Sequence, residues 1–172
     1  MEVDRSTLEF RKKQAISTIV ANKELYPERK VFVVELNGSA ESAVNAALCV
    51  EAIGKENVVG VLMPNVTAGL AGYKARELAD ILGIKLYEIP VTTAVAGISV
   101  ELSCVLNGGV SPNVELNLPD QVRQITIRSF AESLGGVVIN SKFYRNPDVW
   151  IGCDRDPIEM GKYLNIHEYL LT

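Results

Sequence analysis

The sequence is poor in the residues that would build a disulfide frame, a metal cluster or a nucleic-acid coat. Its three cysteines have no CxxC spacing and it has one histidine, which disfavours disulfides and zinc and favours a reducing cytoplasm. The 17 Lys and Arg residues are outnumbered by 21 Asp and Glu residues, which gives a net charge of −4. A protein that coats DNA or RNA needs the opposite balance, so we expect no nucleic-acid partner.

Long apolar runs are also missing. The most lipid-like stretch, residues 94–106, is interrupted by Glu101, and residues 1–13 lack the apolar centre of a signal peptide. We therefore expect no membrane partner. Hydrophobic residues nevertheless make up 48% of the 172 residues, which excludes a disordered chain. Without a repeat or a linker, residues 1–172 are predicted to form one domain.

Strand and helix patterns alternate along the chain. Apolar, β-branched runs predict buried strands at residues 31–36, 58–63, 86–89 and 137–139. Helical spacing of apolar residues predicts helices at 7–22, 40–53, 70–82, 120–134 and 158–171, the first with a capping box at Ser6 and Glu9. Residues 92–118 are ambiguous, because their first half fits a helix whereas residues 107–109 and 111–113 predict loops.

This alternation predicts an α/β fold in which two helical layers cover a mainly parallel sheet. Ligands of such folds bind beyond the carboxyl ends of the strands, where the strand order reverses. The first strand usually lies beside that point. Residues 35–42 are therefore the first segment to examine for a ligand site.

The segment after the first predicted strand reads Asn37-Gly38-Ser39-Ala40-Glu41-Ser42 and leads into a helix. A helix N-terminus offers unpaired N–H groups and a positive dipole end, which suit a phosphate. Gly38 permits close approach of the backbone, and the hydroxyl groups of Ser39 and Ser42 can donate hydrogen bonds. The loop is neither a Walker A nor a GxGxxG motif. It predicts a phosphate site, with an ordinary helix cap as the alternative.

The loop resembles the SGGxDS pyrophosphate loop of the ATP pyrophosphatase superfamily, and its surroundings are similar to the NAD synthetase family. The similar segments are residues 42–50, 52–64, 75–84, 117–123 and 133–140. The resemblance covers roughly residues 10–145 and implies an adenine nucleotide alpha hydrolase-like fold.

The resemblance also implies a reaction and its site. ATP would adenylate the nicotinate carboxylate of deamido-NAD, and ammonia would displace AMP. The residues expected to contact ATP are Asn37, Gly38, Ser39, Glu41, Ser42 and Arg123, with Glu41 also holding Mg²⁺. In the resembling family the region equivalent to residues 92–119 packs against a second subunit, which implies a homodimer.

The departures from the family pattern gather at the predicted site. Ser39 replaces a glycine, Glu41 replaces an aspartate, and Gln121 stands where an arginine is expected. The run 142–145 replaces residues that meet ATP and substrate, and the chain is short for the family. The alternative to an NAD synthetase-like ligase is therefore an inactive descendant, either a nucleotide-binding module or a homodimeric interaction protein.

Overall fold

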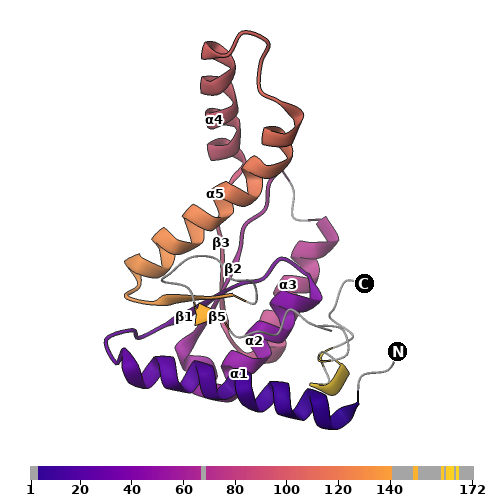
Figure 1. Cartoon of the computed structure of the whole chain (residues 1–172), viewed down its shortest axis with the longest axis vertical. Coiled ribbons are helices and arrows are strands. Elements are labelled where there is room, and N and C mark those ends of the chain that lie inside the picture. The colour runs from indigo at the N-terminus through magenta and orange to yellow at the C-terminus, as the bar shows by residue number, and fades with distance from the viewer. Residues whose placement is uncertain are drawn as a thin grey trace.

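The computed structural model describes residues 4–66, 69–140, 149–150, 160, 162–164 and 166. The helices are α1 (Arg5–Leu25), α2 (Ala40–Ile53), α3 (Gly69–Leu82), α4 (Thr92–Val105) and α5 (Pro112–Ser133), with a 3-10 turn, η1, at Lys55–Asn57. The strands are β1 (Phe32–Glu35), β2 (Val58–Leu62), β3 (Lys85–Glu88), β4 (Val137–Asn140) and β5 (Val149–Trp150). Figure 1 shows their arrangement.

The strands form one sheet in the order β3-β2-β1-β4-β5, and every neighbouring pair is parallel. The chain builds outward from β1 through β2 to β3 and then returns to place β4 on the other side of β1. The strand order therefore reverses at β1, as predicted. Because β1 leads into α2, the α2 N-terminus lies where parallel α/β folds bind ligands.

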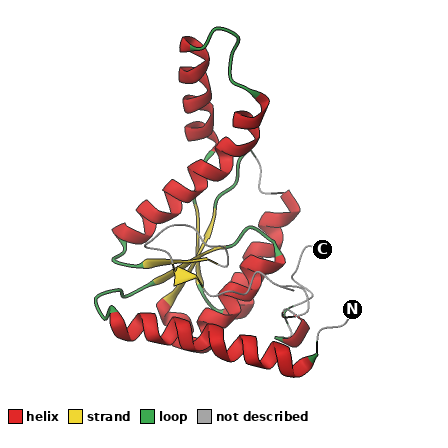
Figure 2. Cartoon of the chain, viewed as in Figure 1, coloured by secondary structure: helices red, strands yellow, loops and turns green. Residues whose placement is uncertain are grey.

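Two apolar clusters show why helices cover both faces of the sheet (Figure 2). Phe32, Val34 and Leu36 are buried on the face covered by α1, α2 and α3. Val33 is buried in the opposite cluster, together with α5 residues such as Val122. Side chains alternate between the two faces of a strand, so β1 is buried on both. The predicted three-layer α/β/α fold is confirmed.

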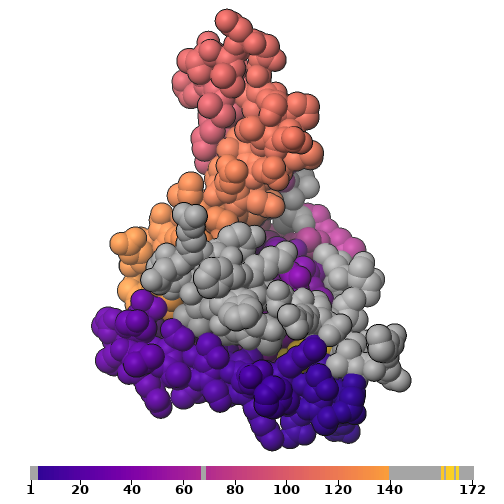
Figure 3. All heavy atoms as spheres, viewed as in Figure 1, coloured from indigo at the N-terminus to yellow at the C-terminus, as the bar shows by residue number. Residues whose placement is uncertain are grey.

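One part of the molecule leaves the layers. Residues 92–117, here called the arm, comprise α4, the connection that follows it and the start of α5. The arm extends away from the sheet in Figure 1 and protrudes in the space-filling view of Figure 3. No residue of α4 is buried, although the helix is mostly apolar.

Three local predictions need correction. The loop predicted at residues 111–113 is the start of α5, because Ser111 takes the N-cap position and Pro112 the first helical position, where a missing N–H costs nothing. The predicted capping box is wrong, since α1 begins after Asp4 and encloses Ser6. The nearby Asn146-Pro147-Asp148 sequence predicts that Trp150 anchors a loop, whereas Trp150 belongs to β5, a strand too short to show a sequence pattern.

Other predictions are confirmed or fall outside the described residues. Helical spacing places Cys49 on the apolar face of the helix predicted at residues 40–53 and so predicts a core residue, and Cys49 is buried in the core. Only fragments of the predicted helix at 158–171 are described, and His167 and residues 142–145 lie outside the described part. Within that part, no helix has both the length and the apolar character needed to cross a membrane.

Candidate functional site

The loop between β1 and α2 is held by its own side chains. Ser39 is the N-cap of α2, and its Oγ accepts a hydrogen bond from the Ser42 N–H at 3.3 Å. Asn37 Oδ1 accepts from the Ser39 N–H at 3.0 Å. The buried Ser42 hydroxyl donates to the Ser39 carbonyl oxygen at 2.9 Å. Gly38 completes the turn with φ of 81°, a conformation that favours glycine.

The loop has features of both predicted structures, the phosphate site and the ordinary helix cap. The cap predicted as the ordinary alternative is present at Ser39, and the segment also brings a helix N-terminus to the carboxyl end of β1. Two loop N–H groups, those of Ser39 and Ser42, already have side-chain acceptors. An anion that used either N–H would have to replace that acceptor. The Ser42 hydroxyl proton is also used, by the Ser39 carbonyl oxygen. The remaining anion-binding capacity therefore depends on the positive helix end and on the Ser39 hydroxyl group.

Glu41 lies in the first turn of α2 and is partly buried. Magnesium in nucleotide sites is usually bound by one or two carboxylates together with phosphate oxygens. A single carboxylate beside a phosphate-binding turn fits that donor set. Within the described residues there is no group of three or more His, Cys, Asp or Glu side chains that would hold a metal without a nucleotide.

Arg123 comes to the sheet from α5, on the other side of the molecule from α2. Its Nε donates to the Met63 carbonyl oxygen at 3.0 Å, just beyond β2, and its Nη1 pairs with Asp120 at 2.5 Å. The side chain is 25% exposed. The fold therefore brings Arg123 to the carboxyl ends of the strands, where the loop between β1 and α2 also lies. Gln121, two residues earlier, is exposed.

Glu35 begins the segment 35–42 that the sequence selects, but it is not among the predicted site residues. It is the last residue of β1 and is partly buried, on the same strand face as Val33. Burial raises the pKa of its carboxyl group, Arg123 opposes the rise, and Asp120 adds to it. The available signal was a charged residue ending an otherwise apolar run, and such perturbed groups concentrate at functional sites.

A second polar side chain near the loop, Asn45, is also absent from the predicted site residues. Asn45 is buried in α2, one turn after Glu41, and its Oδ1 has no hydrogen-bond partner among the residues that the structure describes. Buried amide oxygens usually have a partner, so this one marks an unsatisfied polar position inside α2.

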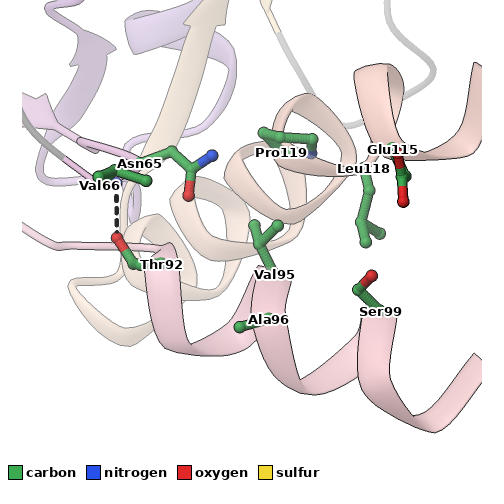
Figure 4. A pocket seen from close by; sticks show the side chains of 9 residues that line it. All are labelled: Asn65, Val66, Thr92, Val95, Ala96, Ser99, Glu115, Leu118 and Pro119. Carbon is green, nitrogen blue, oxygen red and sulfur yellow. Dashed lines mark hydrogen bonds between the residues drawn. The ribbon is translucent and has the colours of Figure 1, made fainter. Parts of the chain in front are cut away.

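A pocket of about 290 Å³ lies at the base of the arm, separate from the loop (Figure 4). It is lined by Asn65, Val66, Thr92, Val95, Ala96, Ser99, Glu115, Leu118 and Pro119. Val66 has φ of 68°, which is unusual for a β-branched residue, and its N–H donates to Thr92 Oγ1 at 2.7 Å. That bond ties the connection after β2 to the first residue of α4.

Comparison with solved structures identifies the fold. Solved structures with the same fold include NMN synthetase from Francisella tularensis, with a TM-score of 0.76 and 18% identity over 92% of this chain and 71% of that one. Another is glutamine-dependent NAD⁺ synthetase from Acinetobacter baumannii in complex with ADP, with a TM-score of 0.73 and 19% identity over 85% of this chain and 31% of that one. The fold is thus the adenine nucleotide alpha hydrolase-like type.

Sequence comparison then defines the family itself. The NAD synthase family profile matches residues 12–144, so the chain belongs to the NAD synthase family. A glutamine-dependent NAD⁺ synthetase from Xanthomonas campestris is 32% identical over 114 residues, which are 66% of this chain and 20% of that protein. The chain spans less than half the length of the curated relatives that it matches first.

Proposed function

We propose that the chain binds ATP with its phosphates at the N-terminus of α2 and acts as an NAD synthetase-like ligase. The observation that carries this proposal is the β1–loop–α2 unit. It has a left-handed Gly38, a Ser39 cap and a location at the reversal of strand order, in a chain of the NAD synthase family. The complex of a structural relative with ADP supports a nucleotide as ligand.

The proposed reaction forms an amide in two steps. The substrate carboxylate of deamido-NAD attacks the α-phosphorus of ATP and pyrophosphate leaves. Ammonia then attacks the carboxyl carbon, AMP leaves, and a proton is released. The protein contributes positioning and charge neutralisation and no nucleophile.

Each predicted residue has a place in this scheme. The α2 N-terminus and the Ser39 hydroxyl group hold phosphate, and the Ser42 hydroxyl group joins them only if it gives up its bond to the Ser39 carbonyl oxygen. Asn37 shapes the loop through its bond to the Ser39 N–H. Glu41 is the carboxylate for Mg²⁺, which would neutralise phosphate charge. Arg123 belongs to α5 and lies at the end of β2, where its positive charge would stabilise the negative charge that develops on the phosphate.

We also propose that the arm forms a homodimer contact. Val105 and Leu116 are each 76% exposed, and α4 buries none of its residues within one chain. Exposed apolar surface of this kind marks an interaction site. The family resemblance names a second copy as the occupant. The cytoplasmic location, the absence of a nucleic-acid partner and the single domain stay predictions.

A second candidate function is nucleotide binding without turnover. It is favoured by the loop geometry, because the N–H groups of Ser39 and Ser42 are already bonded to Asn37 Oδ1 and Ser39 Oγ. A loop that satisfies its own donors stabilises a phosphate less. Losing one preorganised contact to a developing charge costs about 3 kcal/mol, or roughly a hundredfold in rate.

Incubation with ATP, Mg²⁺, deamido-NAD and ammonium separates the two candidates. The ligase produces AMP and NAD in equal amounts, and the Gly38→Ala variant produces less. Saturable ATP binding with no AMP above that produced by the variant would identify the binding module. If the protein neither binds ATP nor produces AMP, both candidate functions are contradicted.

A further inference from the structure

The carboxylate at the end of β1 has no hydrogen-bond donor among the described residues. Glu35 pairs in register with Val61 of β2, and it projects toward α5 as Val33 does. Among the described residues, the oppositely charged neighbour that acts on Glu35 is Arg123, which uses Nε for the Met63 carbonyl oxygen and Nη1 for Asp120. Glu35 is therefore a partly buried carboxylate whose acceptor capacity is unused within the described part of the chain.

Such a group is costly unless something binds it. Removing a carboxylate from water without a hydrogen bond destabilises the charged form, and accordingly burial raises the pKa of Glu35. Asp120 adds a second negative charge from α5. A hydrogen-bond donor on a ligand would therefore stabilise the ionised carboxylate of Glu35, whereas an additional anion would destabilise it.

Only part of a nucleotide has that chemistry. Phosphate oxygens carry negative charge and accept hydrogen bonds, so Glu35 and Asp120 repel them. Ribose hydroxyl groups and the amino group of a base are donors. Glu35 lies three residues before Gly38, a separation of at most about 10 Å along an extended chain. Phosphates at the α2 N-terminus would therefore leave the nucleoside within reach of Glu35.

We propose that Glu35 accepts a hydrogen bond from the nucleoside half of the bound nucleotide and so orients it with its phosphates on α2. This role rests on the proposed ATP site. It makes Glu35 a specificity residue that distinguishes a nucleotide from a bare polyphosphate, because only the nucleotide offers a donor.

The test compares the affinities of ATP and inorganic tripolyphosphate, measured by calorimetry at one Mg²⁺ concentration. Glu35→Leu removes the acceptor, and the ratio of ATP affinity to tripolyphosphate affinity should fall roughly tenfold. Glu35→Gln keeps one acceptor oxygen and should lose less. The matched control is Glu88→Gln, which removes the same charge from the last residue of β3, where Glu88 pairs with Arg76.

Three analogues then identify the donor. Purine riboside triphosphate lacks the base amino group, 2′-deoxy-ATP lacks the 2′-hydroxyl group, and 3′-deoxy-ATP lacks the 3′-hydroxyl group. The analogue that lacks the donor should bind the wild type as weakly as ATP binds the Glu35→Leu variant. Its affinity should not fall further when it is measured with that variant. The proposal would be overturned if Glu35→Leu left the affinity ratio unchanged. It would also be overturned if the loss of affinity caused by every analogue simply added to the loss caused by Glu35→Leu. A wild type that binds neither ATP nor tripolyphosphate would instead contradict the proposed function.

Discussion

Helices α2 and α4 have the same length and a similar apolar character, yet they have opposite environments. Both contain 14 residues. Eight residues of α2 are buried, including Ser42 and Asn45, whereas no residue of α4 is. Helix α2 is packed against the sheet and α1, and α4 stands in the arm beyond the edge of the sheet.

The difference shows that apolar character alone does not bury a helix, because α2 has packing partners in its own chain and α4 remains exposed. A partner for α4 would come from the homodimer proposed above. Burial of α2 fixes the position of its N-terminus, and with it the proposed phosphate site. Exposure of α4 and of the start of α5 leaves surface that a second copy would cover. The core and the arm therefore have different tasks, and substitutions should affect them differently.

The largest expected effect is on stability. Leu48 is fully buried in α2, and Leu48→Ala should lower the free energy of unfolding by about 2–5 kcal/mol because it leaves a cavity. The same change at the exposed Leu116 of the arm should cost less than about 0.5 kcal/mol. Urea unfolding of the two variants at low protein concentration measures both. Equal losses would mean that the arm is part of the core.

The next effect is on assembly. Leu116→Asp should weaken the homodimer at least roughly a hundredfold, because association would then bury an unpaired charge. Analytical ultracentrifugation measures the dissociation constant. Ile81→Asp makes a comparable change at an exposed site of α3, outside the arm, and should leave association intact. A wild type that is monomeric at all concentrations would contradict the dimer contact.

The smallest effect is a pH dependence of stability at Glu35. Burial raises its pKa above the ordinary value of 4.5, so the folded protein holds this proton more tightly than the unfolded chain does. The stabilisation is complete below pH 4.5 and is lost as the pH rises through the raised pKa. Glu35→Gln does not titrate, so its stability relative to wild type should increase across that interval. Thermal melting from pH 4 to pH 8 would show no such trend if Glu35 were solvated.

Local patterns were enough to predict most of the fold, because its strands are buried runs and its helices have clear periodicity. Residues 31–36 and 40–53 became β1 and α2 almost as expected. Segments governed by a single residue were harder. Pro112 was interpreted as part of a loop, although it also suits the first position of a helix.

The site divides in the same way. The loop at residues 37–42 is contiguous, so its cap and its glycine were visible in the sequence. The bond from Arg123 to the Met63 carbonyl oxygen joins residues 60 positions apart, and no local pattern records it. Glu35 was hidden for a related reason, since its unusual environment arises only when α5 packs over β1.

ATP titration of two glycine variants tests the central claim most directly. Gly38 in the α2 loop and Gly109 in the arm have nearly equal φ values, 81° and 79°, so alanine introduces similar backbone strain at both. We predict that Gly38→Ala binds ATP at least roughly tenfold more weakly than wild type, a loss of about 1.4 kcal/mol, and that Gly109→Ala binds it normally. Equal ATP affinity in wild type and both variants would contradict a phosphate site at the N-terminus of α2.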